Sequence, residues 1–211
     1  MAGLRKALGD DAGTHRYLET VRSRGYRFVA MVDQASVGSL AILPLKNLTG
    51  DPEQDCFADV LHDLLITELY KLSGIGVTSR QSTIRYRDSS LSISEIALEV
   101  GVDALVEGSL LRKGGETELT VQLIDGRNDK HLWAERYTCE TSLVLSTIAD
   151  MASAIGVEIG ADEASPEADR AMLARTAPVD PRAIDAYALG TAHLEQLSKD
   201  GIRTAIGQLE T

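Results

Sequence analysis

The segment from Asp59 to Asp63 carries the side chains of this sequence that are most suited to binding a metal ion. Asp59 and Asp63 are four residues apart and would share one face of a helix, with His62 beside them. Carboxylates and imidazoles are common metal ligands, but no further cluster of such residues accompanies this group. Acidic residues on the outer face of a helix are ordinary, so we interpret the two carboxylates as part of such a face and expect no metal.

Patterns typical of catalysis or cofactor binding are weak elsewhere in the sequence. The turn from Thr49 to Pro52 leads into a predicted helix, whose first N–H groups could in principle bind an anion. Asp51 is a favourable N-cap residue, however, and its own side chain would accept hydrogen bonds from these groups. The glycine spacing matches neither a P-loop nor a dinucleotide-binding motif, and GxSxG, HExxH and CxxC motifs do not occur. We therefore expect a protein that is not an enzyme, with no catalytic residue and no cofactor.

The composition is that of an acidic, folded protein. The 211 residues are 44% hydrophobic, which leaves room for one large domain or two small ones. A formal net charge of -11 argues against a surface that binds nucleic acid or membranes throughout, and aromatic residues, at 4%, are too few to stack bases. No uninterrupted apolar run approaches the roughly 20 residues of a membrane helix, so we expect a cytoplasmic chain without a membrane segment.

The two cysteines, Cys56 and Cys139, are far apart and have neither zinc-ligand nor redox-motif spacing. A disulfide framework would require more cysteines in a shorter chain. We therefore expect two buried, free thiols.

Basic charge is concentrated near the N-terminus. Residues 1–30 hold six basic and three acidic side chains and so carry +3, which leaves -14 for the rest of the chain. Leu4–Leu8 has the pattern of the last turn of a helix, ended by Gly9. β-Forming residues from Tyr17 to Val29 flank Ser23-Arg24-Gly25, which predicts a β-hairpin with a basic tip. Such a segment is too small to bury a core of its own.

Residues 36–160 show alternating strand and helix patterns. The apolar run from Leu40 to Leu45 is typical of a buried strand, and Asp51, Pro52 and Gln54 mark the start of a helix that ends at Gly74. The pattern then predicts a strand at Ile75–Ser79, a helix capped by Ser92 and Glu95 and ended by Gly101, three antiparallel strands at Ala104–Leu111, Leu119–Leu123 and His131–Tyr137, and a helix at Ser142–Ile159. We interpret His131 and Trp133 as a surface pair on one strand. The fold class expected is α/β (α+β), a compact mixed sheet with helices.

The C-terminal part is helical in pattern. Gly160 to Ala177 is rich in Ala, Asp and Glu and is typical of a linker, with a short helix after Ser165-Pro166. Pro181 opens a new amphipathic helix, and a further helix starts near Ile202.

Two stretches near the N-terminus, LRKALGDD (Leu4 to Asp11) and RYLETVRSRGYRF (Arg16 to Phe28), resemble the C-terminal portion of the OmpR/PhoB-type winged-helix DNA-binding domain. In that family, the first stretch is the tail of the recognition helix and the second is the wing hairpin, which approaches the minor groove. The resemblance implies that DNA is contacted by five basic residues, Lys6, Arg16, Arg22, Arg24 and Arg27. The front of the recognition helix, which reads base edges, is expected before Met1, so this chain should bind DNA weakly and with little sequence preference.

Three stretches of the middle segment resemble the TolB-amino-terminal-like domain. They are LAILPLKNLTGDPEQDCFADVLHDLL (Leu40 to Leu65), EVGVDALVEGSLLR (Glu99 to Arg112) and LTVQLIDGRNDKHLWAERY (Leu119 to Tyr137). AYALGTAHL (Ala186 to Leu194) and AIGQLE (Ala205 to Glu210) look like the start of a tetratricopeptide repeat, which must stack with further repeats to be stable. The TolB-like family stands between such repeats and an effector domain, either a winged helix or a class III nucleotide cyclase.

These resemblances imply four parts. Residues 1–30 would be the end of the recognition helix and the wing, residues 36–160 the TolB-like α/β domain, residues 161–180 a linker, and residues 181–211 the incomplete start of a repeat. This order is similar to that of CadC-like one-component transcriptional regulators. We therefore expect a fragment of a bacterial, DNA-binding transcriptional regulator, in which the TolB-like domain senses a signal or assembles copies and the repeats bind protein partners.

Further expectations concern partners. Winged-helix regulators of this type commonly bind paired half-sites, which implies a homodimer. Two alternatives stay open: a TolB-like protein-interaction module, in the envelope or the cytoplasm, that does not bind DNA, or an adaptor domain of a nucleotide-cyclase-type signalling protein.

Overall fold

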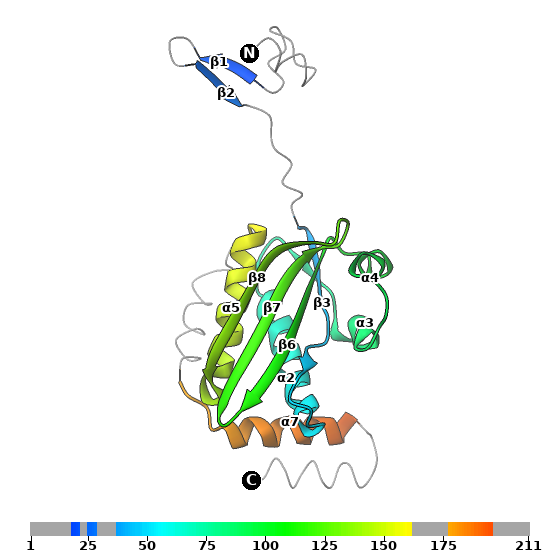
Figure 1. Ribbon diagram of the computed structural model, residues 1–211, viewed down its shortest axis with the longest axis vertical. Helices are drawn as coiled ribbons and strands as arrows, with labels where there is room; N and C mark the ends of the chain where they lie inside the picture. Colours follow the sequence, from blue (N-terminus) through cyan, green and yellow to red (C-terminus); the bar gives the residue numbers. More distant parts are fainter. Residues whose placement is uncertain (1–17, 22–24, 29–36, 162–176, 196–211) are drawn as a thin grey trace. The chain divides into compact units, whose positions relative to one another are not determined.

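The computed structural model describes residues 18–21, 25–28, 37–161 and 177–195, and the chain divides into two compact units (Figure 1). The N-terminal unit contains two antiparallel strands, β1 (Leu18–Val21) and β2 (Gly25–Phe28). Their pairing confirms the predicted hairpin. The predicted helix end at Leu4–Leu8 lies outside the described residues.

The α/β unit begins at Val37. Its elements are β3 (Ser39–Ile42), β4 (Lys46–Asn47), α2 (Glu53–Tyr70), β5 (Gly76–Val77), α3 (Arg80–Thr83), the 3-10 helix η1 (Ile84–Tyr86), α4 (Ile93–Val100), β6 (Ala104–Lys113), β7 (Glu116–Asp125), β8 (Lys130–Glu140), the 3-10 helix η2 (Thr141–Leu143), α5 (Val144–Ile159) and α7 (Pro181–Glu195). The predicted order of strands and helices is confirmed, whereas α3 and η1 had no clear signal in the sequence.

A mixed sheet forms the centre of this unit, with the strand order β5-β3-β6-β7-β8 and with β4 paired to β6. β3 runs parallel to both β5 and β6, because helical crossovers connect these strands. β6, β7 and β8 form the predicted antiparallel meander. Gly114 and Gly115 close the first hairpin with φ angles of 61° and 89°, a left-handed conformation that glycine adopts most easily. The mixed α/β fold expected from the sequence is therefore confirmed.

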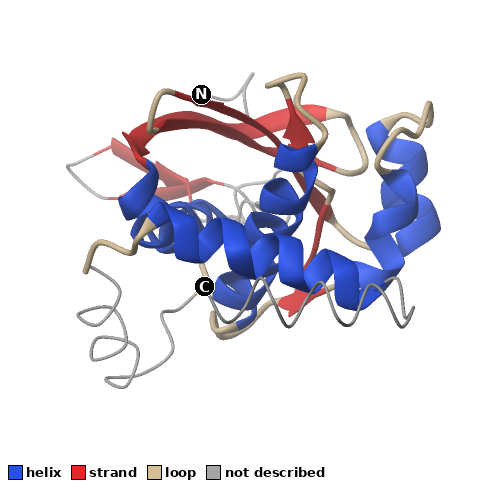
Figure 2. Ribbon diagram, turned by 90° about the horizontal axis from the view of Figure 1, so that it is seen from below, coloured by secondary structure: helices blue, strands red, loops and turns tan. Residues whose placement is uncertain are grey.

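One face of the sheet carries the main core. Apolar side chains of α2 and α5 pack against alternate residues of the strands, and Figure 2 shows helices gathered on one side of the sheet. The fully buried members include Leu40, Ile42, Phe57, Leu61, Leu65, Val106, Leu110, Leu119, Val121, Ile148 and Ile155. Burial of these side chains supplies the main driving force for folding, at about 1.5–3 kcal/mol for each large one.

A smaller core lies on the opposite face and covers only one end of the sheet. It joins Ala41, Leu43 and Leu105 to Tyr86 of η1 and to Ile96 and Ala97 of α4. The rest of this face, formed by β6, β7 and β8, carries mostly polar side chains such as Glu107, Ser109, Thr120 and Gln122, none of which is fully buried. One-sided covering of an antiparallel sheet in this way is common.

The segment Thr141–Ile159, which contains α5, is long and apolar enough by length and composition to cross a membrane. Core helices of folded proteins share these properties, and here Val144, Ile148, Met151 and Ile155 are fully buried in the main core. The helix thus has a packing role in the described fold.

Helix α7 packs against α2 and is held by Arg112 of β6. The guanidinium of Arg112 binds the Asp185 carboxylate with both nitrogens, at 2.5 and 3.1 Å, and lies 4.8 Å from the centre of the Phe57 ring. Ile184 and Ala188 of α7 are buried in the same region. The first helix of the segment that resembles a repeat is therefore attached to the α/β unit.

Two predicted helix starts had different outcomes. Ser92 and Glu95 form the predicted reciprocal cap of α4, and Gly101 ends that helix at a φ of 79°. The cap predicted from Asp51 and Gln54 is wrong in part. Asp51 Oδ1 accepts a hydrogen bond from the Glu53 N–H at 3.0 Å, but the Gln54 side chain lies 3.4 Å from Arg112. The predicted strand Ile75–Ser79 is also shorter, because only Gly76 and Val77 pair.

We expect Gly108→Ala to destabilise the fold by about 1–3 kcal/mol, because a well-packed site resists added atoms. A Cβ atom at Gly108 would lie 2.7 Å from the backbone oxygen of Thr120 and 2.9 Å from Leu45 Cδ2. The matched control is Gly76→Ala, whose Cβ would meet its nearest neighbour, Gly38 O, at 3.6 Å. Urea unfolding of both variants tests this, and equal midpoints would contradict it.

Candidate functional site

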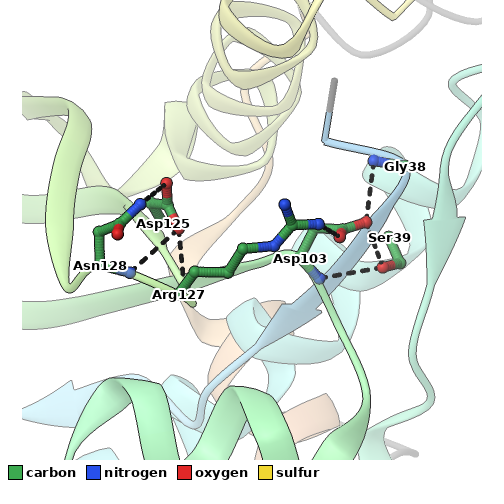
Figure 3. A network of polar contacts seen from close by, with 6 residues as sticks. All are labelled: Gly38, Ser39, Asp103, Asp125, Arg127 and Asn128. Atoms are coloured by element: carbon green, nitrogen blue, oxygen red, sulfur yellow. Dashed lines mark hydrogen bonds and ion pairs between the residues drawn. The ribbon is translucent and has the colours of Figure 1, made fainter. Parts of the chain in front are cut away.

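A polar network fastens the start of the α/β unit at one end of the sheet (Figure 3). Asp103 lies just before β6, and its Oδ2 accepts hydrogen bonds from the Gly38 N–H at 3.2 Å and from Ser39 Oγ at 2.8 Å. The Asp103 N–H in turn donates to Ser39 Oγ at 3.0 Å and to Ser39 O at 3.2 Å. The first residues of β3 are therefore fixed to β6 by side-chain bonds as well as by strand pairing.

The turn between β7 and β8 completes this network. Arg127 Nη2 donates to Asp103 Oδ1 at 2.9 Å. Asp125 holds the turn in shape, because its Oδ1 accepts from the N–H of Arg127 at 2.7 Å and its Oδ2 accepts from Asn128 Nδ2 at 3.0 Å. Figure 3 shows the Arg127 side chain extended from this turn toward Asp103. The start of β3 is thus connected to the β7–β8 hairpin through two carboxylates and one arginine.

Both carboxylates of the network are stabilised in their charged form. The hydrogen bond from Ser39, supported by those from Arg127 and Gly38, lowers the pKa of Asp103 below its ordinary value. The N–H of Arg127, followed by the Asn128 amide, lowers the pKa of Asp125 in the same direction. These bonds favour folding at neutral pH, and acid weakens them.

The acidic face of α2 contacts arginines. Asp59 and Asp63 share a helix face as predicted, and Arg80 lies between them, at 3.7 Å from Asp59 Oδ2 and 3.1 Å from Asp63 Oδ1. Arg87 Nη2 also contacts Asp59 Oδ1. Within the described residues, no group of three or more His, Cys, Asp or Glu side chains is arranged to hold a metal ion. These carboxylates connect α2 to the α3–η1 segment.

His62 is a core residue, unlike the two carboxylates beside it in the sequence. Its ring is fully buried, and Nε2 lies 3.0 Å from the backbone oxygen of Ile42. This contact requires the proton on Nε2, which leaves Nδ1 as an acceptor, and no donor for Nδ1 occurs among the residues described. Burial lowers the pKa of His62, although the Ile42 carbonyl opposes the shift, so the neutral ring is favoured.

A groove opens on the partly covered face of the sheet. It has a volume of about 390 Å³ and lies between β4, the segment leading into α4, and the floor formed by β6 and β7. Ser109, Thr120, Glu107 and Gln122 contribute to its floor. Leu48 and Leu91 stand at its sides and are 50% and 42% exposed, so both add apolar surface to the groove.

The residues predicted to contact DNA are mostly outside the described part of the chain. Lys6, Arg16, Arg22 and Arg24 lie there, and Arg27 lies in β2 opposite Glu19. Their predicted role stays a prediction. Cys56 and Cys139 are free as expected, but both are only partly buried, so the expectation of buried thiols is wrong.

The network around Asp103 is the feature that sequence reasoning missed. Nothing in the sequence pairs Asp103 with Ser39, which lies 64 residues away. Gly126 gives one hint, because its N–H donates to Asp103 O at 2.8 Å and a Cβ there would lie 2.5 Å from Ala97 Cβ. A turn glycine that also approaches a neighbouring helix indicates close packing.

The sequence of the α/β unit is similar to those of known proteins. The family described as HilA/YgeH-like transcriptional regulator, second domain, matches residues 35–154. A Rhizobium meliloti (strain 1021) protein named "Putative adenylate cyclase 3" is 42% identical over 99 residues, which are 47% of this chain. That match spans only 17% of the relative's own length.

Three solved structures are similar to part of this chain. TolB from Acinetobacter baumannii is 16% identical with a TM-score of 0.44, and the match covers 58% of this chain and 28% of that one. Lipoprotein GNA1162 from Neisseria meningitidis is 15% identical with a TM-score of 0.41, with 56% and 96% covered. The C-terminal domain of LpoB from Escherichia coli is 16% identical with a TM-score of 0.38, with 51% and 87% covered.

We expect Asp103→Asn to destabilise the α/β unit by about 1 kcal/mol at pH 7, because charge-assisted hydrogen bonds are lost. The folded-state pKa of Asp103 lies below its ordinary value of 3.8, so its contribution is present above that pH and is lost as the pH falls through the folded-state value. The difference between the wild type and the variant should therefore shrink in acid. Urea unfolding from pH 7 down to the lowest pH at which both fold measures it, with the exposed Asp88→Asn as control. A difference that does not change with pH would contradict the prediction.

We expect His62→Gln to reduce the loss of stability that accompanies mild acidification. The buried ring has a pKa below its ordinary value of 6.5, so the unfolded chain binds a proton more readily, and stability falls as the pH drops below 6.5. Glutamine can still donate to Ile42 O but does not titrate. Unfolding free energies at about pH 7.5 and 5.5 measure the effect. The exposed His131→Gln is the control, and a pH dependence unchanged by His62→Gln would refute the assignment.

Proposed function

This chain belongs to the family of HilA/YgeH-like transcriptional regulators, whose second domain matches residues 35–154, and from that premise we propose that it acts in DNA-dependent transcription control without catalysing a reaction. The family match is the observation that carries the proposal. In this proposal, the N-terminal segment contacts DNA, and the α/β unit couples this segment to a signal or to further copies of the protein.

The distribution of charge supports contact with DNA by the N-terminal segment. Residues 1–30 carry +3, while the rest of the chain carries -14 and would repel phosphate. The resemblance to a winged-helix domain assigns phosphate and minor-groove contacts to Lys6, Arg16, Arg22, Arg24 and Arg27. Sequence-specific reading requires a complete winged helix in the full gene product.

The Asp103 network supports a coupling role for the α/β unit. Gly38 and Ser39 are its first residues, and their bonds to Asp103 connect them to the β7–β8 hairpin through Arg127. In this proposal, a change in the sheet that displaced this hairpin would also displace Gly38 and Ser39, which follow the N-terminal segment in the sequence. Self-association of the unit and protein binding by the C-terminal helices belong to the same proposal, because paired half-sites favour dimeric regulators.

A second candidate function is an adaptor domain of a nucleotide cyclase. It is favoured by the 42% identity over 99 residues to a protein named as an adenylate cyclase. Because that match spans 17% of the relative, the shared part is compatible with one module attached to different effectors. Cyclic AMP formation by the full gene product would support this candidate over transcription control.

The test is selection of DNA duplexes from a randomised library by the full gene product, followed by affinity measurement at several salt concentrations. We expect enrichment of a defined sequence. Arg24→Ala and Arg27→Ala should weaken binding to all duplexes by a similar factor and lower the salt slope by about one for each lost phosphate contact. Arg136→Ala, on the exposed face of β8, is the control and should change neither.

Two outcomes would overturn the proposal. Failure to enrich any sequence over a non-specific basic peptide would leave a protein-interaction module that does not bind DNA. Equal binding by the Arg24 and Arg27 variants and the wild type would remove the hairpin from the DNA contact.

A further inference from the structure

The groove on the sheet face contains one cation and one anion that no other described side chain neutralises. Lys46 of β4 and Glu107 of β6 both line it. Among the residues described, neither forms an ion pair, although Arg87 at the same groove is paired with Asp59. Opposite charges that stand apart in one concave site are well placed to receive a ligand that carries both charges.

The strand register determines how these two charges are spaced. Lys46 is the register partner of Ser109, and Glu107 is two residues before Ser109 on the same face of β6. β4 and β6 are parallel, and with strands about 4.8 Å apart and a rise of about 3.3 Å per residue, such diagonal neighbours have Cα atoms roughly 8 Å apart. The Ser109 hydroxyl lies between them, with Thr120 as its register partner on β7. The gap is therefore bordered by an ammonium, a carboxylate and two hydroxyls.

Glu107 is also oriented by a neighbour. Gln122 Nε2 donates to its Oε1 at 3.3 Å, which leaves Oε2 available to accept from a ligand. The carboxylate is half-buried on the sheet, so a ligand cation there would be partly shielded from water.

The sides of the groove are apolar. Leu48 follows β4, and Leu91 and Ile93 lie at the start of α4, so aliphatic side chains border the polar floor from two elements. Leu48 and Leu91 are 50% and 42% exposed, and covering them would remove apolar surface from water. A ligand that places an aliphatic group here and its charged groups on the floor would satisfy both parts of the groove.

We propose that the groove between β4, β6, β7 and the start of α4 binds a free α-amino acid with an aliphatic side chain, whose ammonium contacts Glu107 and whose carboxylate contacts Lys46. In an α-amino acid the ammonium nitrogen and the carboxylate group are bonded to the same Cα atom, so such a ligand can contact Glu107 and Lys46 through one hydrogen bond of ordinary length at each end. A volume of about 390 Å³ is within the usual range for small-molecule sites and accommodates such a ligand with water. The proposal goes beyond the proposed function, because binding is measured on this chain and does not require DNA.

The experiment is calorimetric titration of the full chain with L-leucine and with three analogues that each lack one feature. N-acetyl-leucine lacks the ammonium, 3-methylbutylamine lacks the carboxylate, and glycine lacks the aliphatic group. We expect L-leucine to bind at millimolar or lower concentrations and each analogue to bind at least about tenfold more weakly. Equal binding of the amine would show that Lys46 is not involved, and equal binding of N-acetyl-leucine would show that Glu107 is not. Either result overturns the proposal.

Variants locate the site on the protein. Glu107→Gln and Lys46→Met should each weaken L-leucine binding by at least about tenfold. Leu91→Ser should weaken binding of L-leucine more than binding of glycine. The controls are Glu118→Gln and Lys113→Met, which remove the same charges from the same sheet outside the groove and should leave binding unchanged. Circular dichroism establishes that each variant is folded.

Two further results would refute the proposal. One is the absence of heat and of any ligand-detected NMR signal with every aliphatic amino acid tested on the folded wild type. The other is binding that survives in the Glu107 and Lys46 variants, which would place the ligand elsewhere. Loss of DNA binding with intact leucine binding would affect only the proposed function, so the two proposals fail independently.

Discussion

The fold depends on β6, because this strand joins the parallel and antiparallel parts of the sheet. Its two faces also lie in different surroundings. It pairs with β3 and β4 on one side and with β7 on the other. Ala104, Val106 and Leu110 point into the main core beneath α2 and α5. On the opposite face, Leu105 packs against η1 and α4, while Glu107 and Ser109 line the groove. Because side chains alternate along a strand, β6 presents one set of residues to the main core and the other set to the smaller core and the groove.

The position of Gly108 follows from the same constraint. At this point β4 rejoins β6, and Leu45 occupies the space that a side chain would need. Because Gly108 has no side chain, Leu45 and Val121 can occupy the main core beneath the groove floor. Close packing beneath a polar surface keeps Glu107, Ser109 and Thr120 in a fixed arrangement. The rigidity of the groove is therefore a property of the main core.

The charged residues of the α/β unit mostly hold elements together. Asp59 and Asp63 attach the α3–η1 segment to α2, Arg112 attaches α7, and Asp103 attaches the first residues of β3. These contacts have defined hydrogen-bond geometry and add to the apolar packing of the same elements in the main and smaller cores.

The sequence by itself determined most of the secondary structure and the fold class, because local interactions dominate there, although α3 and η1 had no clear signal. Alternation gave the meander, the Ser92–Glu95 cap and Gly101 set both ends of α4, and the Gly114-Gly115 turn closed a hairpin. Family membership likewise depends on the sequence of residues 35–154.

Only the tertiary structure decided the remaining features. The burial of His62, the bond between Asp103 and Ser39, and the bulge near Leu123 that places His131 and Trp133 in different environments all depend on contacts between distant segments. The groove has the same origin, because Lys46 and Glu107 approach one another only when β4 joins β6, and no local pattern encodes that pairing.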